Sequence, residues 1–343
     1  MARRLLWASL VLTPATLVAR FAFDADGTTL FVLSALALIP LAWLIGEATD
    51  HAAHHTGDGV GGFLNASFGN APELIIGLFA IADGLTTVVR GSITGSVVSN
   101  ILLVLGAAMI AGGEGKVDAR SLRLQLGAVF AAVVVLLVPS IPGWHGGLSV
   151  HTLALVSIPV AVVMLLGYLA ITAHNLRIHR EAERGEVPAT AWSLTLALAV
   201  LAVATVATAL VSEVLVHSLT DFGKAVGLSE FFIAVVIVAI VGNAAEHGGA
   251  VVIAHRGNTQ LATEIAITSS LQVAVFVAPV LALLSWVVGE GLALSFRVVE
   301  IATMAAAAAF ATFVVWDGRS RRWEGFLLVA AYVGCVAAYW FAG

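Results

Sequence analysis

The sequence predicts an all-α polytopic membrane protein with about eleven transmembrane helices: one N-terminal helix plus two inverted five-helix repeats. Three observations lead to this fold class. Apolar residues make up 60% of the 343 residues and charged residues only 11%, whereas a soluble domain has about 45–50% and 25%. Apolar stretches long enough to cross a bilayer recur along the whole chain. A Gly-Asn-Ala motif that carries a glutamate occurs once in each half.

Each predicted helix follows from the rule that a span needs about 20 predominantly apolar residues. The apolar stretches are continuous, whereas a transmembrane β-strand would be about 10 residues long and would alternate in polarity. Helices are therefore expected throughout. The predicted spans are residues 4–22, 28–47, 60–83, 90–112, 122–140, 148–173, 189–217, 229–255, 260–288, 293–315 and 323–342.

The distribution of basic residues supports these spans and gives an orientation. With a cytoplasmic N-terminus, twelve of the sixteen Lys and Arg residues fall in cytoplasmic segments and four in outer segments. Cytoplasmic loops of membrane proteins carry such an excess. The sequence thus predicts a multi-pass protein of the cell inner membrane, with its N-terminus in the cytoplasm and its C-terminus outside.

One polar segment, residues 175–188, divides the chain. It is interpreted as a cytoplasmic linker. The domain organisation predicted from it is an N-terminal transmembrane helix at 1–27, a first five-helix repeat at 28–174 and a second at 189–343.

The repeat itself is visible in the residues. Positions 69–73 read GNAPE, and positions 242–246 read GNAAE. The two motifs lie five predicted helices apart, so they cross the membrane in opposite directions, as in inverted-repeat transporters. The polar pairs related by the offset between the motifs are Asn70 and Asn243, Glu73 and Glu246, Ser96 and Ser269, and Ser99 and Gln272.

The repeated glutamates are predicted to bind a cation. A charge at the bilayer centre costs about 2.5–3.5 kcal/mol on insertion scales, so it is rarely kept without a function. No Lys or Arg lies in the interior of a predicted span to neutralise it. Gly69, Pro72 and Gly242 should break the helices and free carbonyl oxygens. The predicted ligands are Glu73, Glu246, Asn70, Asn243, Gly69, Gly242, Ser96, Ser99, Ser269 and Gln272.

This ligand set contains only oxygen donors, which suits a hard cation such as Ca²⁺. Two carboxylates shielded from water resist holding two negative charges when the site is empty. One divalent cation or two protons can neutralise them. Antiport follows if the doubly charged empty site cannot reorient. Glu73 and Glu246 are therefore also the predicted proton carriers, and the chain is not expected to be an enzyme or to hold a cofactor.

Five longer segments around the motifs carry a family resemblance. They are GGFLNASFGNAPE (61–73), GNAPELIIGLFAI (69–81), SVVSNILLVLG (96–106), GLSEFFIAVVIVAIVGNAAEHGGAVVIA (227–254) and ITSSLQVAVFVAP (267–279). They resemble the paired signature of the Ca²⁺/H⁺ exchanger (CAX) family within the Ca²⁺/cation antiporter superfamily. The resemblance implies two inverted repeats after one helix, Glu73 and Glu246 as central acidic ligands, and mobile second and seventh helices.

Weaker signals lie outside the repeated motifs. His51, His54 and His55 form an HxxHH run, which is interpreted as a solvated, pH-responsive cytoplasmic loop; a zinc site is the alternative. The run resembles one histidine box of di-iron desaturases, but the other histidines form no second box. His247 adjoins Glu246, where a proton relay and a packed histidine are equally consistent. Glu230 and Asp83 are candidate entrance carboxylates at the outer ends of their helices.

The remaining alternatives concern substrate and mechanism. The same fold could couple Ca²⁺ to Na⁺ or carry Mn²⁺ or Zn²⁺, and a cation channel is the alternative from another class. The net charge of −5 offers no basic patch for nucleic acid, and the single cysteine excludes a disulfide framework. The expected partners are therefore Ca²⁺, H⁺ and the lipid bilayer. Assembly into a homo-oligomer is left open.

Overall fold

The computed structural model describes residues 2–179 and 191–342, and nearly all of these residues are helical. The predicted linker at 175–188 lies mostly outside the described residues. Two compact units make up the chain, and each draws on both halves of the sequence. Unit 1 comprises Met1–Phe79, Leu166–Gly227 and Val241–Ala245, and unit 2 comprises Ala80–Leu165, Leu228–Ile240 and Glu246–Gly343.

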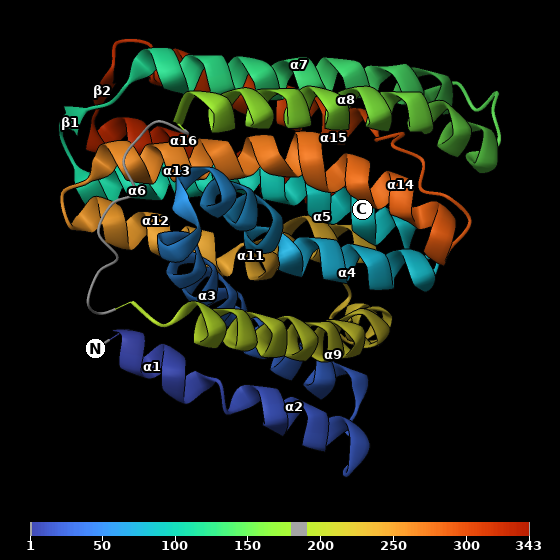
Figure 1. Ribbon diagram of the computed structural model, residues 1–343. Helices are drawn as coiled ribbons and strands as arrows, with labels where there is room; N and C mark the ends of the chain where they lie inside the picture. The colour runs from blue at the N-terminus through green and yellow to red at the C-terminus, as the bar shows by residue number, and fades with distance from the viewer. Residues whose placement is uncertain (1, 180–190, 343) are drawn as a thin grey trace. The chain divides into compact units, whose positions relative to one another are not determined.

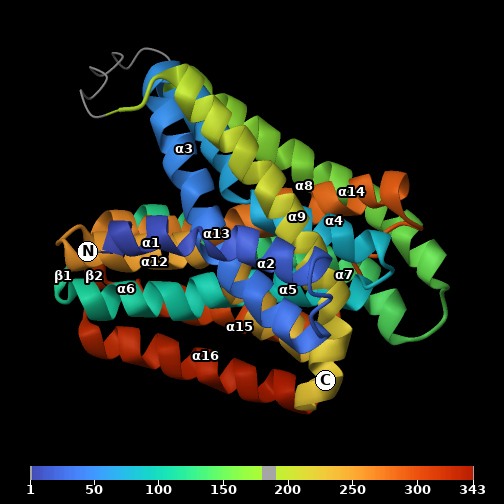
Figure 2. The same cartoon turned by 90° about the horizontal axis from the view of Figure 1, so that it is seen from below.

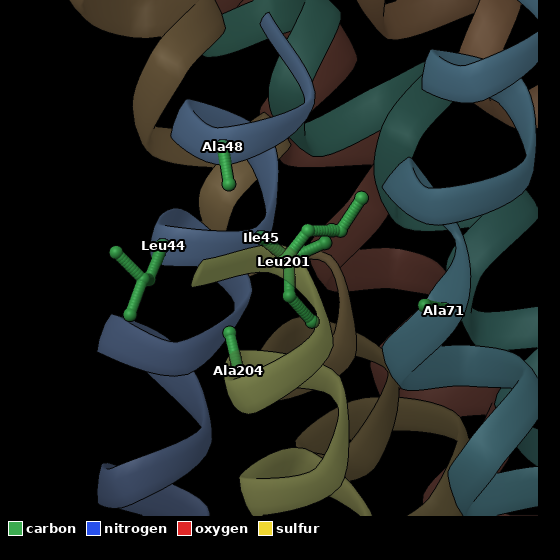
Figure 3. Close-up of a cluster of buried hydrophobic side chains, with 6 residues drawn as sticks. All are labelled: Leu44, Ile45, Ala48, Ala71, Leu201 and Ala204. Atoms are coloured by element: carbon green, nitrogen blue, oxygen red, sulfur yellow. The ribbon is translucent and has the colours of Figure 1, made fainter. Parts of the chain in front are cut away.

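Unit 1 is built around α3 (Gly27–Gly69) and α9 (Leu194–Val226), two long helices that pack along each other (Figure 2). The shorter helix α2 (Leu12–Phe21) packs against both. Apolar side chains fill the contact between α3 and α9: Leu44, Ile45 and Ala48 form one buried cluster with Leu201 and Ala204, which Figure 3 labels. The small residues allow the helix backbones to approach closely. The helices of this region are α1 (Ala2–Ser9), α2 (Leu12–Phe21), α3 (Gly27–Gly69), α4 (Ala71–Ala82) and α9 (Leu194–Val226).

Helix α3 corrects one sequence-based expectation. Separate spans at 28–47 and 60–83 were predicted, with a loop between them, but α3 continues through this region as one helix. Asp26 caps its first turn by accepting a hydrogen bond from the Thr29 N–H at 3.0 Å. No proline interrupts residues 41–69, so nothing in the backbone stops the helix before the Gly-Asn motif.

Unit 2 holds a bundle of helices, several of which run side by side in Figure 1. One close helix contact joins Gly106 to Gly325, where either glycine's ideal Cβ would meet the other's carbonyl oxygen within 2.8 Å. The first elements are α5 (Thr86–Val98), η1 (Ser99–Val104), α6 (Leu105–Gly112), β1 (Gly115–Lys116), α7 (Ala119–Trp144) and α8 (Val150–His179), whose end lies in unit 1. The others are α10 (Glu230–Phe232), η2 (Ile233–Val238), α11 (Ala239–Gly242, partly in unit 1), α12 (Ala244–His255), α13 (Thr259–Gln272), η3 (Val273–Val277), α14 (Ala278–Val288), α15 (Val298–Val314), β2 (Arg319–Ser320) and α16 (Arg322–Ala342).

The internal repeat is visible in the helix boundaries. Helices α4, α5 and α6 begin at 71, 86 and 105, and α12, α13 and α14 begin at 244, 259 and 278, each at the offset that separates the two motifs. The π-helical segments η1 and η3 follow α5 and α13 at matching places. Inside unit 2, the Ser270 hydroxyl donates to the carbonyl of Val97, its own repeat equivalent, at 3.1 Å. Helices α5 and α13, which occupy equivalent places in the two repeats, therefore contact each other at equivalent residues.

The membrane-spanning capacity agrees with the predicted class. Within the described residues, eight helices are long and apolar enough to cross a bilayer, and one further span is a pair bent by 56° at a short break, Glu230–Gly242 with Ala244–His255. Two shorter apolar helices, Ala71–Ala82 and Val298–Val314, accompany them. The chain is thus a multi-pass membrane protein.

Candidate functional site

Both Gly-Asn-Ala motifs interrupt a helix at the same residue. Helix α3 ends at Gly69 and α4 begins at Ala71, so Asn70 lies between them. In the second copy α11 ends at Gly242 and α12 begins at Ala244, so Asn243 lies between them. The predicted helix breaks are confirmed. The second copy has alanine in the place of Pro72, so the shared glycine and asparagine, rather than proline, accompany both breaks.

The breaks place each glutamate in the first turn of a new helix. Glu73 is the third residue of α4, and Glu246 is the third residue of α12. The first turn of a helix has unpaired backbone N–H groups and the positive end of the helix dipole, which favour a carboxylate there. The same local geometry therefore occurs twice, once in each repeat.

Unit 1 brings the first glutamate against the second motif. An ideal Cβ placed on Gly242 would lie 3.2 Å from Oε1 of Glu73 and 3.5 Å from its Cδ. A side chain at this position would press on the carboxylate and displace it by a few tenths of an ångström. Asn70 and Asn243 are almost completely buried, at 1% and 2% exposure. The two motifs, which belong to different halves of the sequence, thus adjoin each other inside one compact unit.

Unit 2 holds the second glutamate with hydroxyl groups. The Ser269 side chain hydrogen-bonds the carboxylate of Glu246. Oε2 of Glu246 is buried and accepts no hydrogen bond within the described part of the chain. Ser96 on α5 and Ser99 at the start of η1 are both buried, near the point where α5 meets α13. Gln272 is half-buried and is the last residue of α13, directly before η3.

Two π-helical segments begin at or directly after two of these polar residues. Ser99 is the first residue of η1, and Gln272 immediately precedes η3. π-Helical turns are rare and are frequent at functional sites because they shift the register of the following side chains. The apolar sequences SNILLV and VAVFV carry no feature that predicts them.

His247 contacts a residue that the sequence reasoning did not select. Its Nε2–H donates to Oδ1 of Asn100 at 3.1 Å in unit 2. Asn100 is fully buried and directly follows Ser99. Asn100 could have been selected from the sequence, because it follows the candidate ligand Ser99 inside a predicted span. The contact gives His247 a packed, hydrogen-bonded position, and its role as a proton relay stays a prediction.

The histidine run is helical, which corrects the expectation of a solvated loop. His51, His54 and His55 lie on α3 in unit 1. The Trp192 N–H donates to Nδ1 of His51 at 3.3 Å, and Nε2 of His55 lies 2.7 Å from the Trp192 carbonyl oxygen. His51 also stacks on the Trp192 ring and lies 3.6 Å from Glu47. Two of the three histidines therefore bind one backbone segment, and no three-ligand metal cluster forms among the described residues.

The proposed entrance carboxylates lie at the far ends of their helices. Asp83 is exposed and directly follows α4, ten residues after Glu73, which corresponds to about 15 Å along a helix. Glu230 is half-buried and begins α10. Neither lies at the motif itself, and a role at an entrance stays a prediction.

A further buried acid, Glu300, has a structural explanation. It is 1% exposed in α15 and was not singled out from the sequence. Its Oε2 accepts the Arg297 N–H at 2.6 Å, and its Oε1 accepts the Thr94 hydroxyl at 3.3 Å. Glu300 thus caps its own helix and ties it to α5.

Comparisons with known proteins give consistent results. Residues 27–177 and 196–341 match the family described as sodium/calcium exchanger protein. The chain is 35% identical over 339 residues to the Ca(2+)/H(+) antiporter of Aphanothece halophytica, covering 92% of this chain and 91% of the relative. It is 38% identical over 318 residues to the Ca(2+)/H(+) antiporter ChaA of Bacillus subtilis, covering 89% and 90%.

Solved structures show the same fold. The structure of native YfkE has a TM-score of 0.85 at 33% identity and covers 97% of this chain and 98% of its own. The H⁺/Ca²⁺ exchanger CAX has a TM-score of 0.74 at 18% identity, covering 99% and 92%, and supports the fold alone.

Proposed function

The chain belongs to the sodium/calcium exchanger protein family, and we propose that it is a secondary antiporter that exchanges Ca²⁺ for H⁺ across a membrane. Two relatives at 35% and 38% identity are named Ca²⁺/H⁺ antiporters, and each aligns over about nine-tenths of both chains. Relatives at 33% identity are named vacuolar calcium ion transporter and vacuolar cation/proton exchanger. A transporter of this family is not a catalytic enzyme.

The observation that carries the site assignment is the contact of Glu73 with Gly242. It joins the acidic residue of the first motif to the backbone of the second motif within unit 1. Glu246 is three residues beyond Asn243 and occupies the same helical position as Glu73. The internal repeat, rather than the packing of the two units, assigns both glutamates to one ion.

The proposed ligands are oxygen atoms from both repeats. Glu73 and Glu246 provide the negative charge, and the buried side chains of Asn70 and Asn243 provide amide oxygens. The candidate set is completed by Ser96 of α5, Ser99 of η1, Ser269 and Gln272 of α13, and the backbone oxygens at Gly69 and Gly242. Ca²⁺ takes six to eight oxygen ligands in adaptable geometry, so such a set fits it.

Exchange follows from the charge of this site. Two carboxylates are neutralised by one Ca²⁺ or by two protons, and leaving both ionised and empty at membrane depth is costly. The protein therefore reorients between its two access states only when loaded with one or the other. Calcium moving one way and protons moving the other way is the result.

The alternatives have less support. The relatives described above are named for protons or calcium, which favours protons over Na⁺ as the counter-ion. Mn²⁺ and Zn²⁺ would compete for the same oxygen ligands, but Zn²⁺ prefers nitrogen and sulfur. A channel would require an open pore rather than a loaded, reorienting site.

The proposed orientation places the N-terminus in the cytoplasm and the C-terminus outside, because it puts most of the Lys and Arg residues in cytoplasmic segments. In a cell inner membrane, the inward proton gradient would then drive Ca²⁺ out of the cytosol.

Flux measurements test the proposal. Purified protein in proteoliposomes is given radioactive Ca²⁺ with an imposed pH gradient, or with an imposed Na⁺ gradient of equal size. We expect uptake driven by the pH gradient alone. Uptake driven only by Na⁺ would assign the sodium-coupled alternative, and equal uptake without any gradient would indicate a channel.

A further inference from the structure

Unit 2 contains a row of polar side chains of which only the last, Gln272, belongs to the proposed ligand set. On α13 the residues Gln260, Glu264, Thr268 and Gln272 follow each other at intervals of four. Side chains at this spacing lie on one face of a helix. All four are half-buried rather than enclosed in the core. The row extends along a membrane-spanning helix, Thr259–Val288, in which polar groups need a partner or water.

Hydrogen bonds connect the first part of the row to the beginning of α7. The Asp118 N–H donates to Oε1 of Gln260 at 2.5 Å, and Nε2 of Gln260 donates to Oε1 of Glu264 at 2.5 Å. One turn further, the Thr268 hydroxyl donates to Oε1 of Gln125 at 2.7 Å. Polar atoms thus line the α7–α13 contact from Gln260 to Thr268.

The row passes beside Ser269, which binds the second glutamate of the proposed site, and ends about one turn beyond it at Gln272. Ser269, the neighbour of Thr268, hydrogen-bonds the Glu246 carboxylate. Glu264 and Gln272 are eight residues apart, which is about 12 Å along the helix. The row therefore joins the end of unit 2 where α13 begins to the candidate ligands.

The matching face of the first repeat has a different character. The residues equivalent to Glu264 and Thr268 are Gly91 and Gly95 on α5. Their ideal Cβ atoms would contact Ala234 and the Val235 carbonyl oxygen of η2, so this face is closed by tight helix packing. The first repeat thus closes this face with small residues, whereas the same face of α13 carries polar side chains that bind α7 and the residue before it.

We propose that the α13 row is the aqueous access path of the divalent cation to Glu246, with Glu264 as the first carboxylate that the hydrated ion meets. This inference rests on the proposed function, because it assumes that Glu246 is a cation ligand. A lone carboxylate along an access path raises the local cation concentration and the rate of loading. The carboxylate acts on one membrane face only, because the row opens at one end of unit 2.

The first test is the substitution Glu264→Gln, which keeps an oxygen acceptor for Gln260 and removes the charge. We expect the KM for Ca²⁺ to rise about 3- to 10-fold at the membrane face where α13 begins, less at high salt, with the maximal rate and the KM at the other face unchanged. Glu114→Gln is the matched control, since Glu114 is exposed in the loop beside Thr259 and outside the row. It should leave both KM values unchanged.

The second test needs no transport. Cys335 is the single native cysteine, so Cys335→Ala gives a background in which Thr268→Cys is the only thiol. A membrane-impermeant methanethiosulfonate reagent should modify this cysteine from one face and more slowly with Ca²⁺ present. Ala266→Cys, at similar depth on the buried side of α13, should not react.

These outcomes separate the two proposals. If the wild-type protein exchanges Ca²⁺ for H⁺ but Glu264→Gln changes neither KM and Thr268→Cys does not react, the access path is wrong and the proposed function stands. Equal KM changes at both faces, or a loss of thermal stability alone, would make the row an interhelical contact and overturn the inference. If the wild-type protein carries no Ca²⁺, the proposed function fails first.

Discussion

Replacing Gly242 with alanine should weaken Ca²⁺ binding and leave the fold intact. The new Cβ would lie 3.2 Å from Oε1 of Glu73, so the carboxylate must retreat by a few tenths of an ångström. Gly242 is the last residue of α11, where alanine otherwise favours the helix by about 0.5–1 kcal/mol. The substitution therefore moves a candidate ligand without introducing a source of unfolding.

The size of the effect follows from related metal sites. Changing a group that positions a ligand typically lowers metal affinity by about 10–100-fold. A shift of a few tenths of an ångström belongs at the low end, so we expect about a 10-fold rise in the KM for Ca²⁺, or about 1.4 kcal/mol. Thermal stability in detergent should change by less than about 1 kcal/mol, because the helix preference of alanine, about 0.5–1 kcal/mol, opposes the cost of displacing the carboxylate.

The assay compares Gly242→Ala with Gly248→Ala in the same proteoliposomes. Gly248 is a helical glycine of α12 with no atom within 4 Å of its ideal Cβ, so the control adds the same methyl group without touching Glu73. We expect only Gly242→Ala to change the KM. A wild-type KM for Gly242→Ala in a folded sample would refute the assignment of Glu73 as a ligand held against this backbone.

Three further predictions concern pH and the histidines. Apparent Ca²⁺ affinity should fall steeply as pH drops below neutral because protons compete for the same carboxylates; an equilibrium binding series that is flat between about pH 6 and 8 would count against shared sites. Replacing His51, His54 and His55 together with Gln should retain exchange, with an altered pH profile and a loss of about 1 kcal/mol for each lost hydrogen bond; complete loss of flux in a folded sample would show that the site is misplaced. The pKa of Asp26, outside the membrane-spanning part, is lowered by its hydrogen bonds to Thr29. Its stabilising effect is therefore present above about pH 4 and lost as pH falls further, and Asp26→Asn should show a correspondingly smaller decline in thermal stability under acid.

The fold class could be predicted from the composition, and the broken helices of the motif from the internal repeat. Apolar runs report membrane spans directly, because lipid tolerates few alternatives to a helix. The offset between GNAPE and GNAAE recurs in the starts of three pairs of helices. The breaks at Asn70 and Asn243 were also predicted, because Gly69, Pro72 and Gly242 disfavour a continuous helix.

Features set by tertiary packing were not predicted. A polar run at 50–58 indicated a loop, but α3 continues through it and binds Trp192 with two histidines that lie 141 and 137 residues away in sequence. The contact of Glu73 with Gly242 also joins distant segments, and the sequence shows only that both are present. The π-helical segments were not predicted either, because their apolar residues carry no local signal.

Removing each repeated carboxylate tests the central claim most directly. Glu73→Gln and Glu246→Gln keep the size of the side chain and remove one negative charge, so neither variant can balance a divalent cation. We expect each variant to fold, as judged by gel filtration and thermal unfolding, and to show no Ca²⁺ uptake into proteoliposomes under a pH gradient that drives the wild-type protein. Near-normal uptake by either variant would contradict the account, because exchange would then not require both repeats.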